Sequence, residues 1–72
     1  MIVFDAITFG KTIRKRRKEL GYTQAMVAQH TGFSVSFISD LERGKSTAEL
    51  EKAIYLANML GMNVELNVRG KR

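Results

Sequence analysis

The sequence predicts a small all-α domain of four helices, followed by one β-strand that pairs with a second copy of the chain. Three observations predict this fold. Apolar residues recur at helical spacing as far as residue 60, glycines stand where helices would end, and residues 63–69 alternate between apolar and polar side chains. The 72 residues are 44% hydrophobic and include no proline and no cysteine. A chain of this length is expected to form a single domain over residues 1–72, without a disulfide framework.

The first helix is expected over residues 6–20, with Asp5 as its N-cap and Gly21 as its stop. Its apolar positions, including Ile13, follow a period of 3.6 residues. The opposite face carries a basic stripe at the spacing i, i+3, i+4, i+7, formed by Lys11, Arg14, Lys15 and Lys18. This stripe is equally compatible with a solvated face and with contact to an anionic partner.

Two short helices are expected next, over residues 24–31 and 34–43. Thr23 and Ser34 have the side chains that cap helix N-termini, and Gly32 between the helices permits a left-handed turn. The inward-facing residues of the two helices are predicted to be Val27, Ala28, Ile38 and Leu41.

A fourth helix is expected over residues 48–60, because Ser46 and Glu49 have the spacing of a capping box and Gly61 provides a stop. Its apolar set is wider than the stripe needed to cover one core face. Extra core packing is the simplest use of this surplus. A small domain has little core to share, however, so we expect part of the surplus at a dimer interface, namely Tyr55, Leu56 and Met59.

The predicted strand at residues 63–69 needs a partner, because a lone strand leaves its backbone N–H and C=O groups unpaired. Its apolar side consists of Val64, Leu66 and Val68. One possible partner is the segment of residues 2–4, from the same or the neighbouring chain. The preferred partner is the same strand of a second subunit, in a two-fold intermolecular sheet that places these three residues at the dimer interface.

The net charge of the chain limits the classes of partner that it is expected to bind. Twelve basic residues against seven acidic ones give a net charge of +5, which favours attraction to phosphate-rich partners. Apolar runs are far too short to span a membrane, so a cytoplasmic, nucleoid-associated protein without membrane contact is expected. The sequence has one histidine, no cysteine and no phosphate-cradling glycine loop. We therefore expect neither an enzyme nor a metal or cofactor site, and predict no catalytic residue.

The segment "GYTQAMVAQHTGFSVSFISDLERGK", residues 21–45, resembles the helix-turn-helix motif of the Xre-type, lambda-repressor-like family. An ordinary pair of packed helices is the alternative interpretation. The resemblance implies a four-helix domain whose third helix enters the major groove of a double-stranded DNA operator, as in a transcriptional repressor. It also implies a structural ion pair between Arg17 and Glu42, since members of the family often join the first and third helices in this way.

The residues expected to meet DNA follow from the outward face of the third helix and from the helix ends. Val35, Ser36, Ser39 and Asp40 are the candidates for reading bases, through a thymine methyl contact, hydroxyl hydrogen bonds and acceptance from a cytosine amino group. The candidates for binding phosphate are Thr23, Gln24, Ser34, Arg43 and Lys45. No bidentate Arg, Asn or Gln reader is present among the base-reading candidates, so modest direct readout per half-site is expected.

The ending "MNVELNV", residues 62–68, resembles that of the Hip-type (HipB-like) antitoxins, which swap a terminal strand into a dimeric sheet. This resemblance implies a homodimeric, autoregulating antitoxin of a HipBA-type toxin–antitoxin pair, with a HipA-like serine/threonine kinase toxin as partner. Two alternatives remain: a stand-alone phage or plasmid repressor, and a protein-interaction domain that has lost DNA binding.

Overall fold

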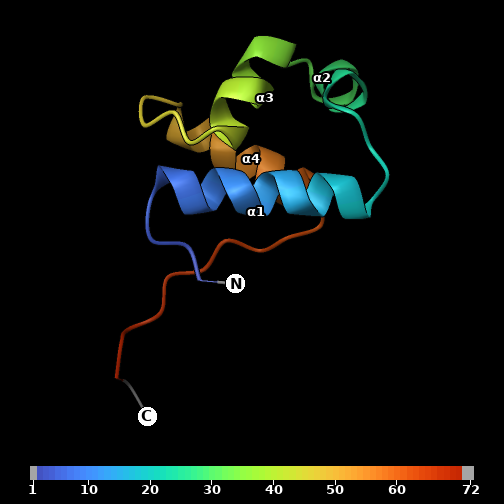
Figure 1. Cartoon of the computed structure of the whole chain (residues 1–72). Coiled ribbons are helices and arrows are strands. Elements are labelled where there is room, and N and C mark those ends of the chain that lie inside the picture. The colour runs from blue at the N-terminus through green and yellow to red at the C-terminus, as the bar shows by residue number, and fades with distance from the viewer. Residues whose placement is uncertain (1, 71–72) are drawn as a thin grey trace.

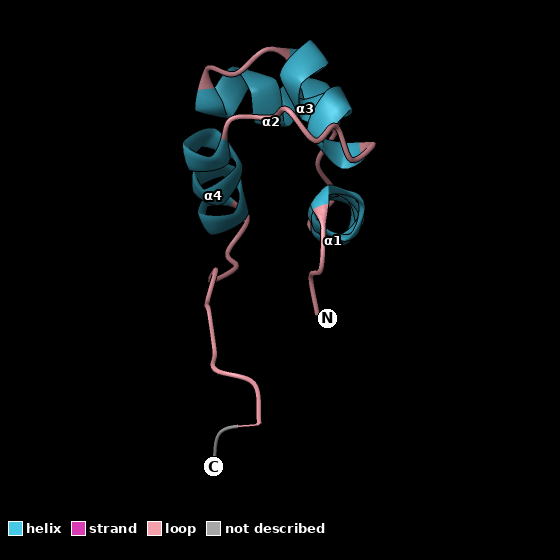
Figure 2. Ribbon diagram, turned by 90° about the vertical axis from the view of Figure 1, so that its left-hand side faces the viewer, coloured by secondary structure: helices cyan, strands magenta, loops and turns pink. Residues whose placement is uncertain are grey.

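Four helices make up the regular secondary structure of the computed structural model, which describes residues 2–70: α1 (Ala6–Glu19), α2 (Gln24–Thr31), α3 (Val35–Glu42) and α4 (Leu50–Met59). Helix α3 packs against both α1 and α2. Viewed along α1, helices α1 and α4 lie on opposite sides, with α2 and α3 above them (Figures 1 and 2). The helices therefore surround one core, with α2 and α3 together at one end of the molecule.

Local capping explains where the first three helices begin. Each predicted N-cap is confirmed, because its side chain accepts a hydrogen bond from the backbone N–H three residues later, at 2.8 Å for Asp5, 3.0 Å for Thr23 and 3.0 Å for Ser34. Gly32 is the C-cap that follows α2, and its φ of 81° is the left-handed conformation expected there. Caps that act within three residues are visible in the sequence, so these boundaries could be predicted.

The expected start of the fourth helix is wrong. Helix α4 begins at Leu50, two positions later than expected, with Glu49 at the N-cap and no side-chain hydrogen bond to the cap. The chain makes a turn first, in which the Ala48 backbone N–H donates to the Lys45 carbonyl oxygen at 3.4 Å. Ser46 lies inside this turn, so it does not form the capping box that its spacing with Glu49 suggested.

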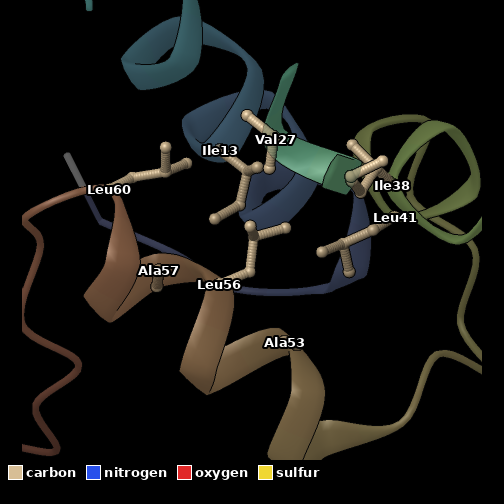
Figure 3. Packing of buried hydrophobic residues seen from close by; sticks show 9 residues of the cluster. Ile13, Val27, Ile38, Leu41, Ala53, Leu56, Ala57 and Leu60 are labelled. Carbon is tan, nitrogen blue, oxygen red and sulfur yellow. The ribbon is translucent and has the colours of Figure 1, made fainter. Parts of the chain in front are cut away.

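The core is built from buried apolar side chains of all four helices: Ile13, Val27, Ala28, Ile38, Leu41, Ala53, Leu56, Ala57 and Leu60. Figure 3 shows Leu56 of α4 pointing into the space between Ile13 and Leu41. Leu56 is 0% exposed, so its expected place at a dimer interface is wrong. It lies on the same face of α4 as Ala53 and Leu60, and the chain's own core covers that face.

Helix α1 approaches the end of α3 very closely at Gly10. A Cβ atom at this position would collide with the Leu41 carbonyl oxygen and would lie 2.7 Å from the Glu42 carbonyl oxygen. The obstacle is backbone, which cannot rotate away as a side chain can. The absence of a side chain at residue 10 therefore sets the distance between α1 and the end of α3.

The described residues contain no strand, so the strand expected at residues 63–69 is absent from the single chain. Met62 still packs against the core, and residues 63–70 then continue as a loop that runs away from the helices, on the side where residues 2–5 also lie (Figures 1 and 2). Val64, Leu66 and Val68 are 44%, 98% and 77% exposed. A strand requires a neighbour for its backbone hydrogen bonds, and no segment within residues 2–70 lies beside this one as a ladder partner.

Within the same described region, no helix combines the length and apolar character that crossing a membrane requires. Residues 2–70 also contain no group of three or more His, Cys, Asp or Glu side chains arranged to hold a metal ion.

Candidate nucleic-acid interface

Helix α3 has one buried face and one face turned to solvent. Ile38, Leu41 and Glu42 are 0%, 4% and 6% exposed, and they attach the helix to the body of the protein. On the other face, Val35 and Ser36 are exposed. The remaining two candidates for reading bases, Ser39 and Asp40, are half-buried. All four predicted residues therefore share a helix that has solvent on one side, with the first two standing farthest out.

The caps of α2 and α3 place two hydroxyl groups beside exposed helix N-termini. The side-chain oxygens of Thr23 and Ser34 accept hydrogen bonds from the Met26 and Phe37 backbone N–H groups. Both capping residues are exposed, and a hydroxyl that accepts a bond still has its own proton to donate. Each cap can therefore stabilise its helix and donate a hydrogen bond to an anion, which the positive end of the helix dipole also favours.

The structure contains the ion pair between Arg17 and Glu42, which joins α1 to α3. Arg17 Nε donates to Glu42 Oε2 at 2.6 Å, and Arg17 Nη2 donates to Oε1 at 3.0 Å. A third donor, Nη1 of the same guanidinium, binds the Tyr22 carbonyl oxygen at 2.8 Å. The side chains are only 8% and 2% exposed, so this bidentate pair is buried and its hydrogen-bonding groups are satisfied.

The environment of the pair shifts both pKa values towards the charged forms. Burial alone raises the pKa of Glu42, but the hydrogen bonds from Arg17 and Gln24, with the nearby charges of Arg17 and Arg14, lower it below its ordinary value. The hydrogen bonds that Arg17 donates to Glu42, with the negative charge of that carboxylate, raise the pKa of Arg17, although burial opposes this effect. Both side chains are therefore ionised at neutral pH.

Gln24 makes a contact that was not predicted from the sequence. Its Nε2 atom donates to Glu42 Oε1 at 3.1 Å, so the first residue of α2 is tied to the last residue of α3. The side chain is half-buried. Gln24 thus helps to fix the angle between the two helices, and one of its two amide N–H groups is already used within the protein. Nothing in the spacing of residues 24 and 42 signals this contact.

At the end of α3, the carboxylate of Asp40 binds two cations. Arg43 Nη2 lies 2.7 Å from Asp40 Oδ1, and Lys45 Nζ lies 3.4 Å from Oδ2. The three side chains are 30%, 71% and 57% exposed in the order Asp40, Arg43 and Lys45. One predicted base reader is therefore paired with both cations predicted to bind phosphate. The i, i+3 spacing of Asp40 and Arg43 is a signal that could have indicated the first of these pairs.

The remaining candidates, predicted for the dimer interface, lie in different environments. Tyr55 is 46% exposed and packs edge-on against Phe33, with ring centroids 5.7 Å apart. Met59 is half-buried near the end of α4. Together with the exposed side chains of Val64, Leu66 and Val68, this leaves several apolar groups accessible on α4 and the segment after it.

Comparison with known proteins identifies the class to which this fold and surface belong. The helix-turn-helix family model HTH_3 matches residues 13–67, which include the whole of α2 and α3. The chain therefore belongs to the helix-turn-helix family.

Two relatives are HTH-type transcriptional regulators of Sinorhizobium fredii (strain NBRC 101917 / NGR234). The chain is 35% identical to the uncharacterized regulator y4mF over 63 residues, which cover 88% of this chain and 83% of the relative. It is 38% identical to the uncharacterized regulator y4dJ over 58 residues, which cover 79% and 75% of the two chains. Its relatives are thus regulators of similar length.

Two solved structures share the fold at low sequence identity. One is the complex of a HipB variant, with one serine replaced by alanine, and an O2 20mer, with a TM-score of 0.86, 19% identity and coverage of 96% of each chain. The other is the HipB-O4 20mer complex, with a TM-score of 0.85, 17% identity and coverage of 96% of this chain and 97% of the other. The predicted resemblance to HipB is confirmed at the level of the fold.

Proposed function

We propose that the protein is a homodimeric, sequence-specific transcriptional repressor that binds a double-stranded DNA operator through α2 and α3. The observation that carries this proposal is that the two faces of α3 differ in exposure. The inner face is buried at Ile38 and Leu41, whereas Val35 and Ser36 on the outer face are exposed. A helix held in this way by a preceding short helix has the geometry that enters a major groove. Membership of the helix-turn-helix family and the two regulators among its relatives support the same function.

Base reading is assigned to the outward face of α3. Val35 is suited to contact a thymine methyl group, and the hydroxyl groups of Ser36 and Ser39 to bind base edges of either kind. Asp40 is proposed as an acceptor for a cytosine amino group only if its two cations leave it. These residues include no bidentate reader, so sequence preference is expected to depend also on DNA shape and on two half-sites bound together.

Phosphate binding is assigned to the helix caps and to the cations after α3. The proposed contacts come from Thr23, Gln24, Ser34, Arg43 and Lys45. These contacts fix the position of the protein on the duplex but carry no sequence information. The net charge of +5 adds attraction that is independent of sequence and sensitive to salt.

The homodimer is proposed to form through the segment after α4. Val64, Leu66 and Val68 are exposed and alternate with polar residues, and burying them against the same segment of a second chain would complete a strand ladder in a two-fold sheet. Tyr55 and Met59 are proposed to contribute from α4. In support, the structural likeness to HipB covers 96% of the chain. It therefore extends into the segment of residues 62–70.

A finer proposal is that the protein is the autoregulating antitoxin of a HipBA-type pair, with a HipA-like kinase toxin as its partner. The shared fold with HipB and the terminal segment favour it over a stand-alone phage or plasmid repressor. The test is the neighbouring gene. An adjoining reading frame that encodes a kinase-like protein which co-purifies with this chain is expected, and its absence would favour the stand-alone repressor.

DNA binding itself is tested by fluorescence anisotropy with labelled duplexes from the region upstream of the protein's own gene, alongside shuffled duplexes of equal length. We expect preferential binding to the upstream duplex and a steep loss of affinity between about 50 and 200 mM salt, with a log–log slope of about 0.9 per neutralised phosphate. Equal, weak binding to both duplexes would instead favour a protein-interaction domain that has lost DNA binding.

A further inference from the structure

We propose that Asp40 acts as an internal competitor of DNA phosphate, holding Arg43 and Lys45 and so limiting the affinity of the protein for any duplex. This inference rests on the proposed function, because it concerns how strongly the α3 surface binds DNA. It assigns Asp40 a role different from reading a base. The two roles predict opposite effects of removing its charge, so they can be separated by experiment.

The geometry makes Asp40 the centre of a three-residue cluster. Arg43 Nη2 binds Asp40 Oδ1 at 2.7 Å, and Lys45 Nζ approaches Oδ2 at 3.4 Å, so each carboxylate oxygen has a cation. Asp40 is the least exposed member, with 30% of its side chain accessible, and it belongs to α3 itself. Arg43 and Lys45 follow the helix and are much more exposed, at 71% and 57%.

These exposures determine which groups can move. Asp40 is held by the helix, whereas the long side chains of Arg43 and Lys45 can turn from the carboxylate to another anion without disturbing the core. A DNA phosphate offers the same kind of ligand that the carboxylate now supplies, because both accept charge-assisted hydrogen bonds from guanidinium and ammonium groups. A phosphate that draws Arg43 and Lys45 away from Asp40 therefore replaces these contacts, and its binding gains only the difference between two similar interactions.

Charge adds a second effect in the same direction. The cluster carries two positive charges and one negative charge, so its net contribution to the local field is about half of what Arg43 and Lys45 would provide alone. An acidic group on the helix that enters the groove also lies close to the phosphates on either side of that groove. Both the replaced ion pairs and the reduced field lower the affinity for DNA of any sequence, which is how a phosphate competitor differs from a base reader.

The experiment compares the wild-type protein with Asp40→Asn, which removes the charge and keeps the shape. Affinities for the upstream duplex and for a shuffled duplex are measured by anisotropy between about 50 and 200 mM salt. The expected result is tighter binding of Asp40→Asn to both duplexes, by about fivefold at the lower salt concentration, the order of one exposed ion pair. The salt slope should become steeper by up to about 0.9 for each phosphate newly neutralised.

A double-mutant cycle shows whether the effect passes through the two cations. In a background of Arg43→Gln with Lys45→Gln, replacing Asp40 by Asn should raise affinity clearly less than in the wild-type background, because no cation remains to be released and only the repulsion of DNA by Asp40 itself is removed. An equal gain in both backgrounds would overturn the proposal, because Asp40 would then act only through its own repulsion of DNA. Melting temperatures of all variants, measured in parallel, identify any change that comes from the fold.

Glu19→Gln is the matched control. Glu19 also forms an exposed i, i+3 pair, with Arg16 Nη1 at 3.5 Å, but it belongs to α1 and not to α3. Its removal changes the net charge by the same amount, so a gain as large as that of Asp40→Asn would assign the effect to overall charge and overturn the inference.

The remaining outcomes separate this inference from the proposed function. Weaker binding of Asp40→Asn to the upstream duplex, with unchanged binding to the shuffled one, would make Asp40 a base reader and overturn its role as competitor. If the wild-type protein shows no preference between the duplexes, the proposed function fails. An Asp40→Asn variant that still binds both duplexes more tightly would then support the competitor role by itself.

Discussion

The side chain of Glu42 connects three helices, because it belongs to α3 and binds Arg17 of α1 and Gln24 of α2. It accepts two hydrogen bonds from Arg17 and one from Gln24, and it lies on α3 directly above the close approach of α1. An isolated charge is costly to bury, so the carboxylate of Glu42 needs these three hydrogen bonds to remain buried and ionised at this position. Loss of one member should therefore affect the placement of α2 and α3 as well as overall stability.

The lowered pKa of Glu42 predicts how stability depends on pH. The carboxyl group has an ordinary pKa of 4.5, which we take for the unfolded chain, and a lower one in the folded protein. Its contribution is therefore complete above about pH 4.5 and is lost as the pH falls through the lower, folded pKa. Urea unfolding of the wild-type protein from about pH 6 to about pH 3 should show this decline.

Glu42→Gln should unfold more easily at neutral pH, by about 3 kcal/mol, because Arg17 then keeps a buried charge without its counterion. Its stability should also change less with pH below about 4.5, although the lowered pKa of Asp5 leaves part of the dependence in place. Glu19→Gln, which removes an exposed partner, should cost less than about 1 kcal/mol. An acid transition as steep in Glu42→Gln as in the wild type would contradict this assignment.

At the scale of secondary structure, the contact between α1 and α3 depends on a residue without a side chain. Glycine inside a helix normally costs about 1 kcal/mol relative to alanine, so replacing it usually stabilises a protein. Gly10 is an exception, because a Cβ atom there meets the carbonyl oxygens of Leu41 and Glu42. Helix α1 would have to move away from α3, and the bonds of Arg17 to Glu42 would lengthen.

Gly10→Ala is therefore expected to lower the free energy of unfolding by about 1 to 3 kcal/mol, the range for an overpacked contact. Chemical denaturation measures this change. Lys11→Ala, at the exposed neighbouring position, should leave stability within about 0.5 kcal/mol of the wild type. A Gly10→Ala variant more stable than the wild type would show that the two helices are not in close contact.

A substitution on the exposed face of α3 is expected to weaken DNA binding without changing the stability of the fold. Ser36 is exposed and takes no part in the core, so Ser36→Glu should melt within a few degrees of the wild type. A carboxylate in the groove repels phosphate and base acceptors, so operator affinity should fall by at least about tenfold. Anisotropy titration and thermal melting test the two parts.

Asn58→Glu adds the same charge at an exposed position of α4 and should reduce affinity much less than Ser36→Glu. If Ser36→Glu lost both its affinity and its stability, Ser36 would belong to the core, and the assignment of the outward face would be wrong.

At the scale of the whole molecule, the helical body and the terminal segment differ. Residues 6–60 contain the core, and Met62 packs against it, whereas residues 63–70 include Leu66, which is 98% exposed. An apolar stretch of this kind is stabilised by burial against another chain. The proposed dimer provides such a partner and also sets the spacing of two α3 helices along the DNA.

Leu66→Asp is expected to convert the dimer to a monomer, because a charge would have to be buried in the intermolecular sheet. Light scattering and sedimentation measure the mass, and operator affinity should fall with it, since a monomer holds a single half-site. Asn67→Asp, the neighbouring exposed residue on the polar side of the alternation, is the control and should remain dimeric. A dimer that persists in Leu66→Asp would exclude the strand-based interface.

The sequence by itself determined the features that depend on near neighbours. The N-caps of α1, α2 and α3, the left-handed turn at Gly32 and the buried positions of α3 follow from residues a few places apart, so their pattern is visible without a structure. The outward residues of α3 follow from the same periodicity. This explains why the helix-turn-helix unit could be predicted in detail.

Only the tertiary structure decided the features that join distant parts of the chain. The burial of Leu56 and the bond of Gln24 to Glu42 depend on packing between segments that no local pattern relates. The expected terminal strand depends on a second chain, because its backbone hydrogen bonds require a partner strand that residues 2–70 do not supply. Local sequence thus sets the helices, while burial and hydrogen bonding over long range set which of their side chains remain available for binding.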